Sequence, residues 1–199
     1  MPTCRRGDAE RDLGDLLSDL RLAVQEAVKW FWAKHEGDAH WMEHRTQANL
    51  IRDRAANVEL PRLILGKAGI KDVEHNQVKV FLIERGRKVY SIKVKQMDEL
   101  GGISLGKTQL SFNYNDNAQL EIPGIPNKAI ALHLGAVPNI ARRNDPEILL
   151  ACADGDEPAW IIRLSDSEPP PVVELVPVPA PDEGTRRIRV KRPDREKSS

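Results

Sequence analysis

Residues 101–114, with the sequence GGISLGKTQLSFNY, contain two overlapping patterns that would serve different chemistry. The first begins at Gly101 and ends in Gly106-Lys107-Thr108, which matches the phosphate-binding loop of nucleoside triphosphatases. The second begins at Gln109 and reads Gln109-Leu110-Ser111-Phe112, which starts like the short peptide by which bacterial proteins dock on the DNA sliding clamp. The first pattern would make the protein an NTPase, and the second would make it a partner-binding protein.

A phosphate loop needs a buried parallel strand before it and a helix that begins at its Lys-Thr pair. Residues 93–99 are too polar for a buried central strand. Residues 109–124 contain Asn-Asp-Asn and a Pro-Gly turn, which prevents a long helix. We therefore interpret Lys107 and Thr108 as a coincidental match, and we expect no nucleotide or other cofactor.

A clamp-docking peptide needs one glutamine amide at the rim of a pocket and a few apolar side chains that fill a groove. Gln109, Leu110 and Phe112 supply these groups, but the leucine that usually precedes the aromatic residue is absent, so Phe112 comes one position early. The alternative is a β-strand with Leu110 and Phe112 on the face that meets a core. The residues alone leave both interpretations open.

Histidines and basic residues offer two further kinds of site. His40 and His44 lie one helical turn apart, but Trp41 stands where a zinc protease would have its glutamate, so we expect no metal site. The segment 77–95, a predicted hairpin, carries basic side chains that form a candidate nucleic-acid face. The residues expected to contact nucleic acid are Arg85, Arg87, Lys88, Lys93 and Lys95. The alternative is that these residues form the solvent-exposed side of a half-buried sheet, because alternation along a strand predicts such a polar side as well.

A small nuclease is the enzymatic alternative, because nucleases of this size cut RNA or DNA with few groups. A metal-dependent site would combine Glu84, Asp98 and Glu99 with a lysine, and a metal-free site would use His133 with Arg142 and Arg143. The spacing singles out neither set. We therefore expect no catalysis and keep the nuclease as the alternative.

The positions of apolar residues predict helices first and strands afterwards. Apolar residues at three- and four-residue steps predict an amphipathic helix over 10–35, and further helices are expected over 39–57, with Trp41 inward, and 60–68. Strands are expected over 78–83, 89–94, 109–114, 129–134, 148–153 and 159–164. This order predicts an α+β fold with N-terminal helices packed on an antiparallel β-sheet.

Composition divides the chain into four segments. Residues 1–9 are expected to be a disordered N-terminus, 10–70 a helical segment and 71–165 the sheet segment of the same domain. Residues 166–199 are rich in proline and then in basic residues, which predicts a disordered tail. The 30 basic and 30 acidic residues give a net charge of zero, which argues against a dedicated DNA coat. Without a signal sequence, a long apolar run or a disulfide framework, we expect a cytoplasmic protein without membrane contact.

Several features together give the chain a family resemblance. They are a helical N-terminal half, a basic hairpin, Lys107-Thr108-Gln109 with an aromatic residue shortly after, the segment LEIPGIP at 120–126, Leu132-His133-Leu134-Gly135, and a closing strand with Ala159-Trp160-Ile161. With these features, residues 30–165 resemble bacterial toxins of the SocB type.

The resemblance implies a toxin that stalls DNA replication by occupying the sliding clamp. It also implies a toxin–antitoxin system in which a proteolytic adaptor of the SocA type delivers the toxin to the ClpXP protease. Gln109, Leu110, Ser111 and Phe112 would then be the clamp contacts. The expected function is inhibition of replication by competition with other clamp clients, and the alternative is a nucleic-acid-binding protein or nuclease that uses the hairpin.

Overall fold

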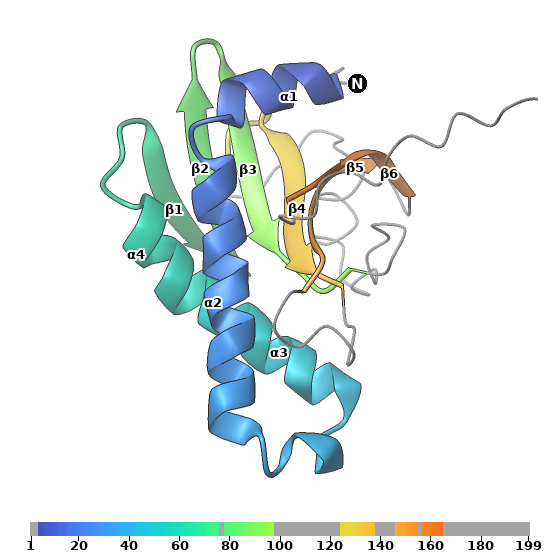
Figure 1. Cartoon of the computed structure of the whole chain (residues 1–199). Helices are drawn as coiled ribbons and strands as arrows, with labels where there is room; N and C mark the ends of the chain where they lie inside the picture. Colours follow the sequence, from blue (N-terminus) through green and yellow to red (C-terminus); the bar gives the residue numbers. More distant parts are fainter. Residues whose placement is uncertain (1–3, 76–77, 98–123, 138–145, 155–156, 165–199) are drawn as a thin grey trace, which may run out of the picture. The chain divides into compact units, whose positions relative to one another are not determined.

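The computed structural model describes residues 4–75, 78–97, 124–137, 146–154 and 157–164 (Figure 1). The elements in chain order are α1 (Arg6–Leu13), α2 (Leu17–His35), η1 (Ala39–Trp41), α3 (His44–Arg54), η2 (Ala55–Glu59), α4 (Leu60–Ile64), β1 (Ile70–His75), β2 (Val78–Arg85), β3 (Lys88–Val94), β4 (Ile130–Ala136), β5 (Ile148–Asp154) and β6 (Glu157–Arg163). Helices precede a six-stranded sheet, so the predicted α+β class is confirmed. Chain contacts separate Met1–Asp166 from Ser167–Ser199, and the second unit, with the predicted tail, lies outside the described residues.

The first two helices correct two expectations. α1 begins at Arg6, inside the stretch 1–9 that we expected to be disordered, and the expected helix over 10–35 is divided at Gly14. A tight turn, in which the Leu16 amide donates to the Leu13 carbonyl at 2.8 Å, joins α1 to α2. Leu13 and Leu16 are both fully buried, because the apolar stripe continues across the turn. Burial of this stripe therefore holds α1 against the main core.

The second helical region runs from His44 to Ile64 with a wider π-helical turn, η2, in its middle. The Leu60 amide donates to the Ala55 carbonyl across this turn. Pro61 follows directly and has no N–H to donate, so the change in hydrogen bonding coincides with a proline near the start of α4. Trp41 was expected to face inward, but η1 leaves it 83% exposed. The α-helix expected over 39–57 begins only at His44, after the separate 3-10 turn η1.

The strands are adjacent in the sheet in chain order, β1-β2-β3-β4-β5-β6. Four neighbouring pairs are antiparallel, as expected, but β3 and β4 are parallel, with Tyr90 opposite Ile130. The sheet is therefore mixed. A parallel pair needs a long connection that returns the chain to the starting end, and some 35 residues separate these two strands here. β1 was not predicted, because its sequence IKDVEH has only two strongly apolar residues.

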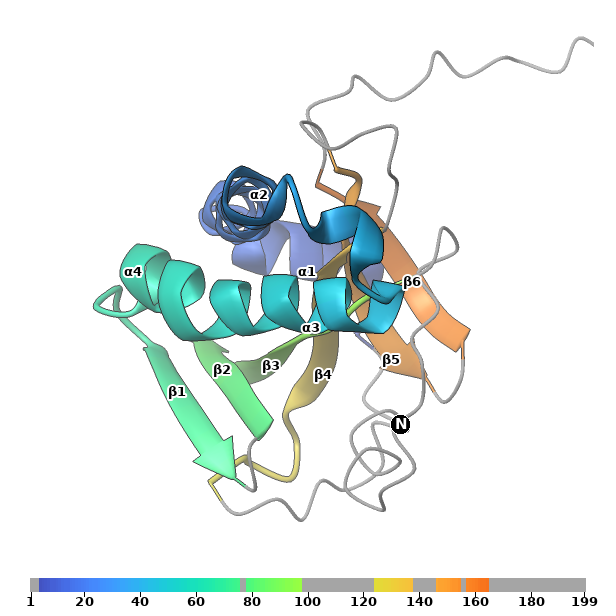
Figure 2. The same ribbon diagram turned by 90° about the horizontal axis from the view of Figure 1, so that it is seen from below.

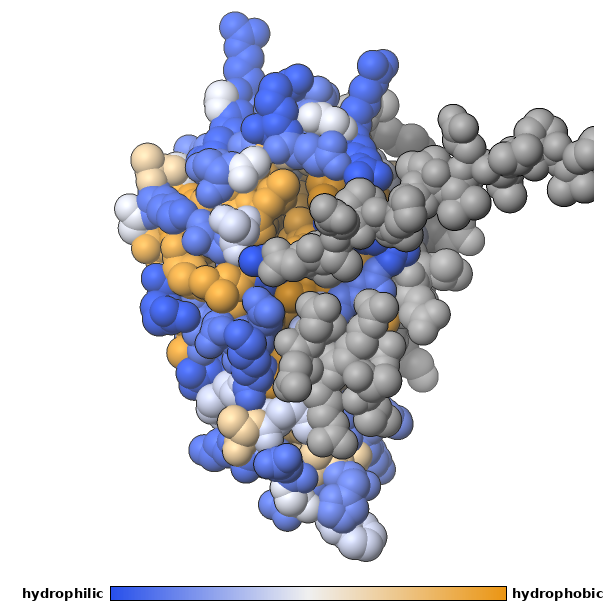
Figure 3. All heavy atoms as spheres, viewed as in Figure 1, coloured by the Kyte–Doolittle hydropathy of each residue, from blue (hydrophilic) through white to orange (hydrophobic). Residues whose placement is uncertain are grey.

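The helices of the described residues lie on one face of the sheet (Figures 1 and 2). Alternate strand residues, among them Phe81, Ile92 and Leu132, pack with the buried side chains of α1, α2 and α4 in the main core. Figure 3 shows apolar side chains in the upper half of this view, bordered by hydrophilic ones. Smaller clusters around Leu82 and Leu149 lie on the opposite face. Both faces of the central strands are thus buried.

Candidate functional site

The clamp-docking pattern lies outside the described residues. Gln109, Leu110, Ser111 and Phe112, the expected strand over 109–114 and the phosphate-loop pattern all fall between Met97 and Gly124. This interval belongs to the connection between β3 and β4. The prediction that residues 109–112 bind a clamp therefore stays a prediction.

The basic residues of the hairpin do not share one surface. Arg85 and Lys88 lie at the turn between β2 and β3 on the helical face, where each pairs with an acidic residue. Arg85 Nη2 lies 3.0 Å from Asp15 Oδ2. Arg87 is exposed at the same turn. Lys93 and Lys95 lie at the other end of β3, and alternation puts them on the opposite face from Lys88.

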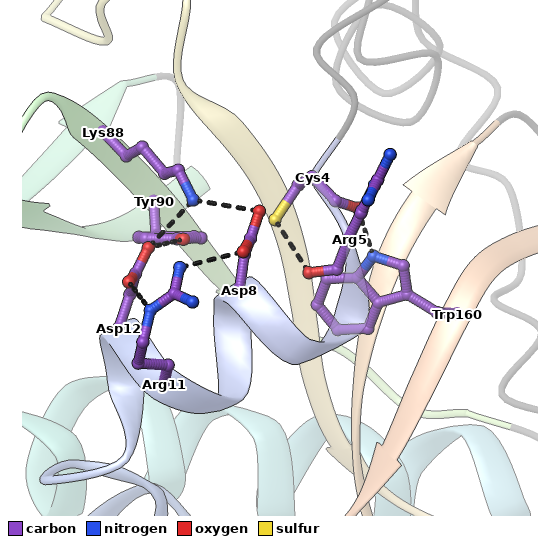
Figure 4. A network of polar contacts seen from close by, with 8 residues as sticks. All are labelled: Cys4, Arg5, Asp8, Arg11, Asp12, Lys88, Tyr90 and Trp160. Carbon is purple, nitrogen blue, oxygen red and sulfur yellow. Dashed lines mark hydrogen bonds and ion pairs between the residues drawn. The ribbon is translucent and has the colours of Figure 1, made fainter.

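A network of polar contacts joins α1 to β3 around Asp12 (Figure 4). Asp12 Oδ2 accepts a hydrogen bond of 2.7 Å from the Tyr90 hydroxyl and one of 3.0 Å from Lys88 Nζ. Lys88 Nζ also lies 3.4 Å from Asp8 Oδ2, one helical turn away, and Arg11 donates to Asp8 at 2.8 Å. Tyr90 is fully buried, so its hydroxyl needs this partner.

The same network reaches β6 through the residues that precede α1. The Trp160 indole donates a hydrogen bond of 2.7 Å to the Cys4 carbonyl, as Figure 4 shows. Cys4 is partly buried against the main core. These contacts attach both ends of α1 to the sheet. Sequence reasoning missed them; the available signal was a tyrosine on the inward side of a strand, whose hydroxyl must find a partner.

The electrostatics of this network do not activate a nucleophile. Burial and the hydrogen bond to Asp12 raise the pKa of Tyr90, and burial also raises the pKa of the Cys4 thiol. The hydrogen bond from Tyr90 lowers the pKa of Asp12, while the bond to Asp12 raises that of Lys88. Each shift favours the protonation state that the group already has at neutral pH, which is the pattern of a structural contact.

The second group of basic residues lies where β3 and β4 run side by side. Lys93 pairs in register with His133, and the Lys95 amide donates to the Leu134 carbonyl at 2.9 Å. His133 is only 1% exposed, and both lysines are partly buried. Sequence reasoning proposed Lys93, Lys95 and His133 in separate roles, and the structure places all three side by side.

Charge and burial act together on these side chains. Burial, with the charges of Lys95 and Arg52, lowers the pKa of Lys93 to about 8. Burial and Arg52 also lower the pKa of Lys95. The pKa of His133 falls well below its usual value because of burial and the two lysines. A bound anion would oppose all three shifts.

The other candidate residues for chemistry are dispersed. Among the described residues, no three His, Cys, Asp or Glu side chains gather in a way that could hold a metal ion. The His35 ring lies 5.3 Å from that of Phe31, and the His40 ring lies 4.7 Å from that of Trp41. Glu84 pairs with Lys71, whereas Asp98, Glu99, Arg142 and Arg143 lie outside the described residues.

Comparison with protein-family models, curated proteins and solved structures found no match to this chain. Within the described part, no helix has both the length and the apolar character that a membrane span requires.

Proposed function

We propose that this protein binds the bacterial DNA sliding clamp through Gln109-Leu110-Ser111-Phe112 and so acts as a toxin-like inhibitor of replication. The observation that carries the proposal is the place of this peptide in the chain. It falls in the connection between β3 and β4, and the six described strands consist of other residues.

Strand pairing explains why this place matters. A docking peptide has to offer its backbone and side chains to a groove on another protein, which an interior strand of a sheet cannot do without breaking its pairing. β3 already has β2 and β4 as neighbours, and β4 has β3 and β5. Docking through residues 109–112 therefore requires no described strand pair to separate.

The chemistry of docking needs no catalytic group. The Gln109 amide would form hydrogen bonds at the rim of the clamp groove, while Leu110 and Phe112 would fill its apolar floor. Each anchor should contribute about 2 kcal/mol or more, as buried hot-spot residues do. Occupation of the groove excludes other clients. By the same resemblance, a SocA-type adaptor and the ClpXP protease would remove the inhibitor.

The proposal is tested by clamp binding with purified proteins. The double variant Gln109→Ala, Phe112→Ala removes two anchors and should weaken binding roughly 1,000-fold, which corresponds to about 4 kcal/mol. Gln96→Ala, Trp41→Ala is a matched control, because it removes an exposed amide and an exposed aromatic ring elsewhere. Absence of binding by the wild type, or equal loss in both variants, would contradict the proposal.

The nucleic-acid alternative receives little support from the hairpin, because Arg85 and Lys88 are paired with acidic residues. Incubation of the wild type with RNA and DNA, with and without magnesium, separates the two functions. Specific cleavage would decide for a nuclease.

A further inference from the structure

β1 is an outer strand of the described sheet. It pairs with β2 on one side, and the strand order places no described strand on its other side. Figures 1 and 2 show it at the margin of the sheet. Lys71, Asp72 and Glu74 are exposed there, so this margin is accessible to a partner.

The hydrogen-bond register directs alternate peptide groups of β1 outward. The Glu84 amide donates to the Gly69 carbonyl at 2.7 Å, so these two residues form a hydrogen-bonded pair. In an antiparallel ladder, such residues alternate with residues whose N–H and C=O groups point away from the neighbouring strand. By the strand register, Asp72 and Glu74 are of the second kind. An extended chain laid along β1 can therefore form a β-ladder with these two residues.

The two faces of β1 differ in their chemistry. Asp72 and Glu74 lie on the helical face, because they are opposite Phe81 of the main core and Lys79. Val73 lies on the other face, where it packs against a smaller apolar cluster. A strand added beside β1 would thus meet carboxylates on one face and an apolar residue on the other.

Carboxylates outnumber cations among the described side chains on the helical face of this margin. Lys79 Nζ lies 3.1 Å from Asp72 Oδ2, and Lys79 is also the residue opposite Glu74. One ammonium group therefore faces two carboxylates. Lys71 and Glu84 pair with each other at 3.2 Å and add no net charge. A basic side chain from an added strand would restore the balance, since cross-strand pairs of opposite charge are stabilising.

A second copy of β1 does not suit the same margin. Two identical strands that pair antiparallel about a two-fold axis place residues of the same face opposite each other. A pair centred on Asp72 sets this residue against itself, and a pair centred on Val73 sets Asp72 against Glu74. Like charges directly opposite each other are destabilising. The charges therefore select against self-pairing and in favour of a basic partner.

We propose that β1 docks an extended segment of a partner protein in which basic and apolar residues alternate. The backbone of this segment pairs with Asp72 and Glu74, and its basic side chains lie beside the two carboxylates. Its apolar side chains extend the cluster on the other face, next to Val73. The docking edge is independent of clamp binding, because it uses none of residues 109–112.

Synthetic peptides test the docking edge on the full chain. The probe is a fluorescent peptide with blocked ends, Thr-Arg-Val-Lys-Val-Arg-Thr, and anisotropy measures its binding at an ionic strength of about 0.15 M. One control peptide has the same composition with its basic residues adjacent, and another has glutamate at each basic position. Both controls should bind at least about tenfold more weakly than the probe, because neither matches the charges along β1.

Charge reversal and removal of a backbone donor give the matched variants. Glu74→Lys should weaken binding of the basic probe at least about fivefold and strengthen binding of the acidic peptide. Glu36→Lys is the control, because Glu36 is an exposed acidic residue at the end of α2. Asp72→Pro should abolish binding and leave the circular dichroism spectrum unchanged, because it removes an N–H that points away from β2.

Hydrogen exchange of the wild type keeps the proposal testable if a variant does not fold. The amides of Asp72 and Glu74 should exchange more slowly with the probe bound, because pairing protects them. Unchanged exchange at these amides, equal binding of the alternating and grouped basic peptides, or equal losses in Glu74→Lys and Glu36→Lys would overturn the proposal. Self-association of the wild type that Asp72→Pro abolishes would overturn it in favour of a second copy.

Discussion

At the scale of single residues, Asp12 is the centre of the contacts between α1 and the sheet. Its carboxylate accepts hydrogen bonds from both Tyr90 and Lys88, and Tyr90 is fully buried. A charged acceptor makes each bond stronger than a neutral one. Loss of either hydrogen bond should therefore lower the free energy of unfolding by more than the loss of a surface ion pair would.

Tyr90→Phe should lower the free energy of unfolding by about 1–2 kcal/mol, because the variant removes a buried hydrogen bond to a charged group. The measurement is urea denaturation. Arg6→Gln removes an exposed pair with Glu10 and should change stability by less than about 0.5 kcal/mol. If both variants have the same stability, the Asp12 network does not stabilise the fold.

The same network predicts how stability depends on pH. The pKa of Asp12 is lower in the folded state than in the unfolded chain, where it is about 3.9. Its contribution is therefore fully present above about pH 4 and is lost as pH falls through the folded-state pKa. Asp12→Asn should be less stable than the wild type at neutral pH and should show a smaller further loss on acidification. Parallel stability profiles of the two proteins would contradict this.

At the scale of elements, the π-helical turn η2 places an acidic residue between two arginines. Glu59 is 4% exposed, and its two carboxylate oxygens pair with Arg54 at 2.7 Å and with Arg62 at 2.9 Å. Arg54 also lies over the Trp30 ring, 5.0 Å from its centroid. The turn thereby connects α3 and α4 with α2.

Glu59→Ala should lower the free energy of unfolding by about 1–3 kcal/mol, because it leaves the buried end of this network without its acceptor. Arg62→Ala removes the more exposed partner and should cost less than about 1 kcal/mol. Thermal unfolding followed by circular dichroism measures both. A larger cost for Arg62→Ala than for Glu59→Ala would show that the buried carboxylate is not the centre of the network.

At the scale of the whole molecule, the parallel pair joins two antiparallel units, β1-β2-β3 and β4-β5-β6. The two backbones approach closely at Gly135, where a Cβ would overlap the Lys95 carbonyl oxygen. Backbone atoms cannot move aside as the end of a flexible side chain can. This glycine is therefore required for the sheet to be continuous.

Gly135→Ala should destabilise the protein by about 3 kcal/mol or more, because it forces the central strands apart. Soluble yield and melting temperature are the measurements. Gly7→Ala is the matched control, because a Cβ there meets no atom within 4 Å and α1 should gain up to about 1 kcal/mol in helix propensity. A melting temperature for Gly135→Ala equal to that of the control would contradict the close approach.

The sequence by itself determined the α+β class and the inward stripe of α2, because periods of 3.6 and 2 follow directly from backbone geometry. It also located the strands that form the β2–β3 and β5–β6 pairs, since short turns join neighbouring antiparallel strands. β1, whose sequence IKDVEH has only two strongly apolar residues, and the break at Gly14 had no such signal.

Only the tertiary structure decided which residues of different elements meet. The parallel pairing of β3 and β4 depends on the path of a long connection, which no local pattern encodes. That pairing brings His133 beside Lys93, and the packing of α1 brings Asp12 to Tyr90. Alternation along β3 puts Lys88 on one face of the sheet and Lys93 on the other. Only the packing of the helices on one of these faces decided that Lys88 meets acidic residues of α1 while Lys93 does not share its surface.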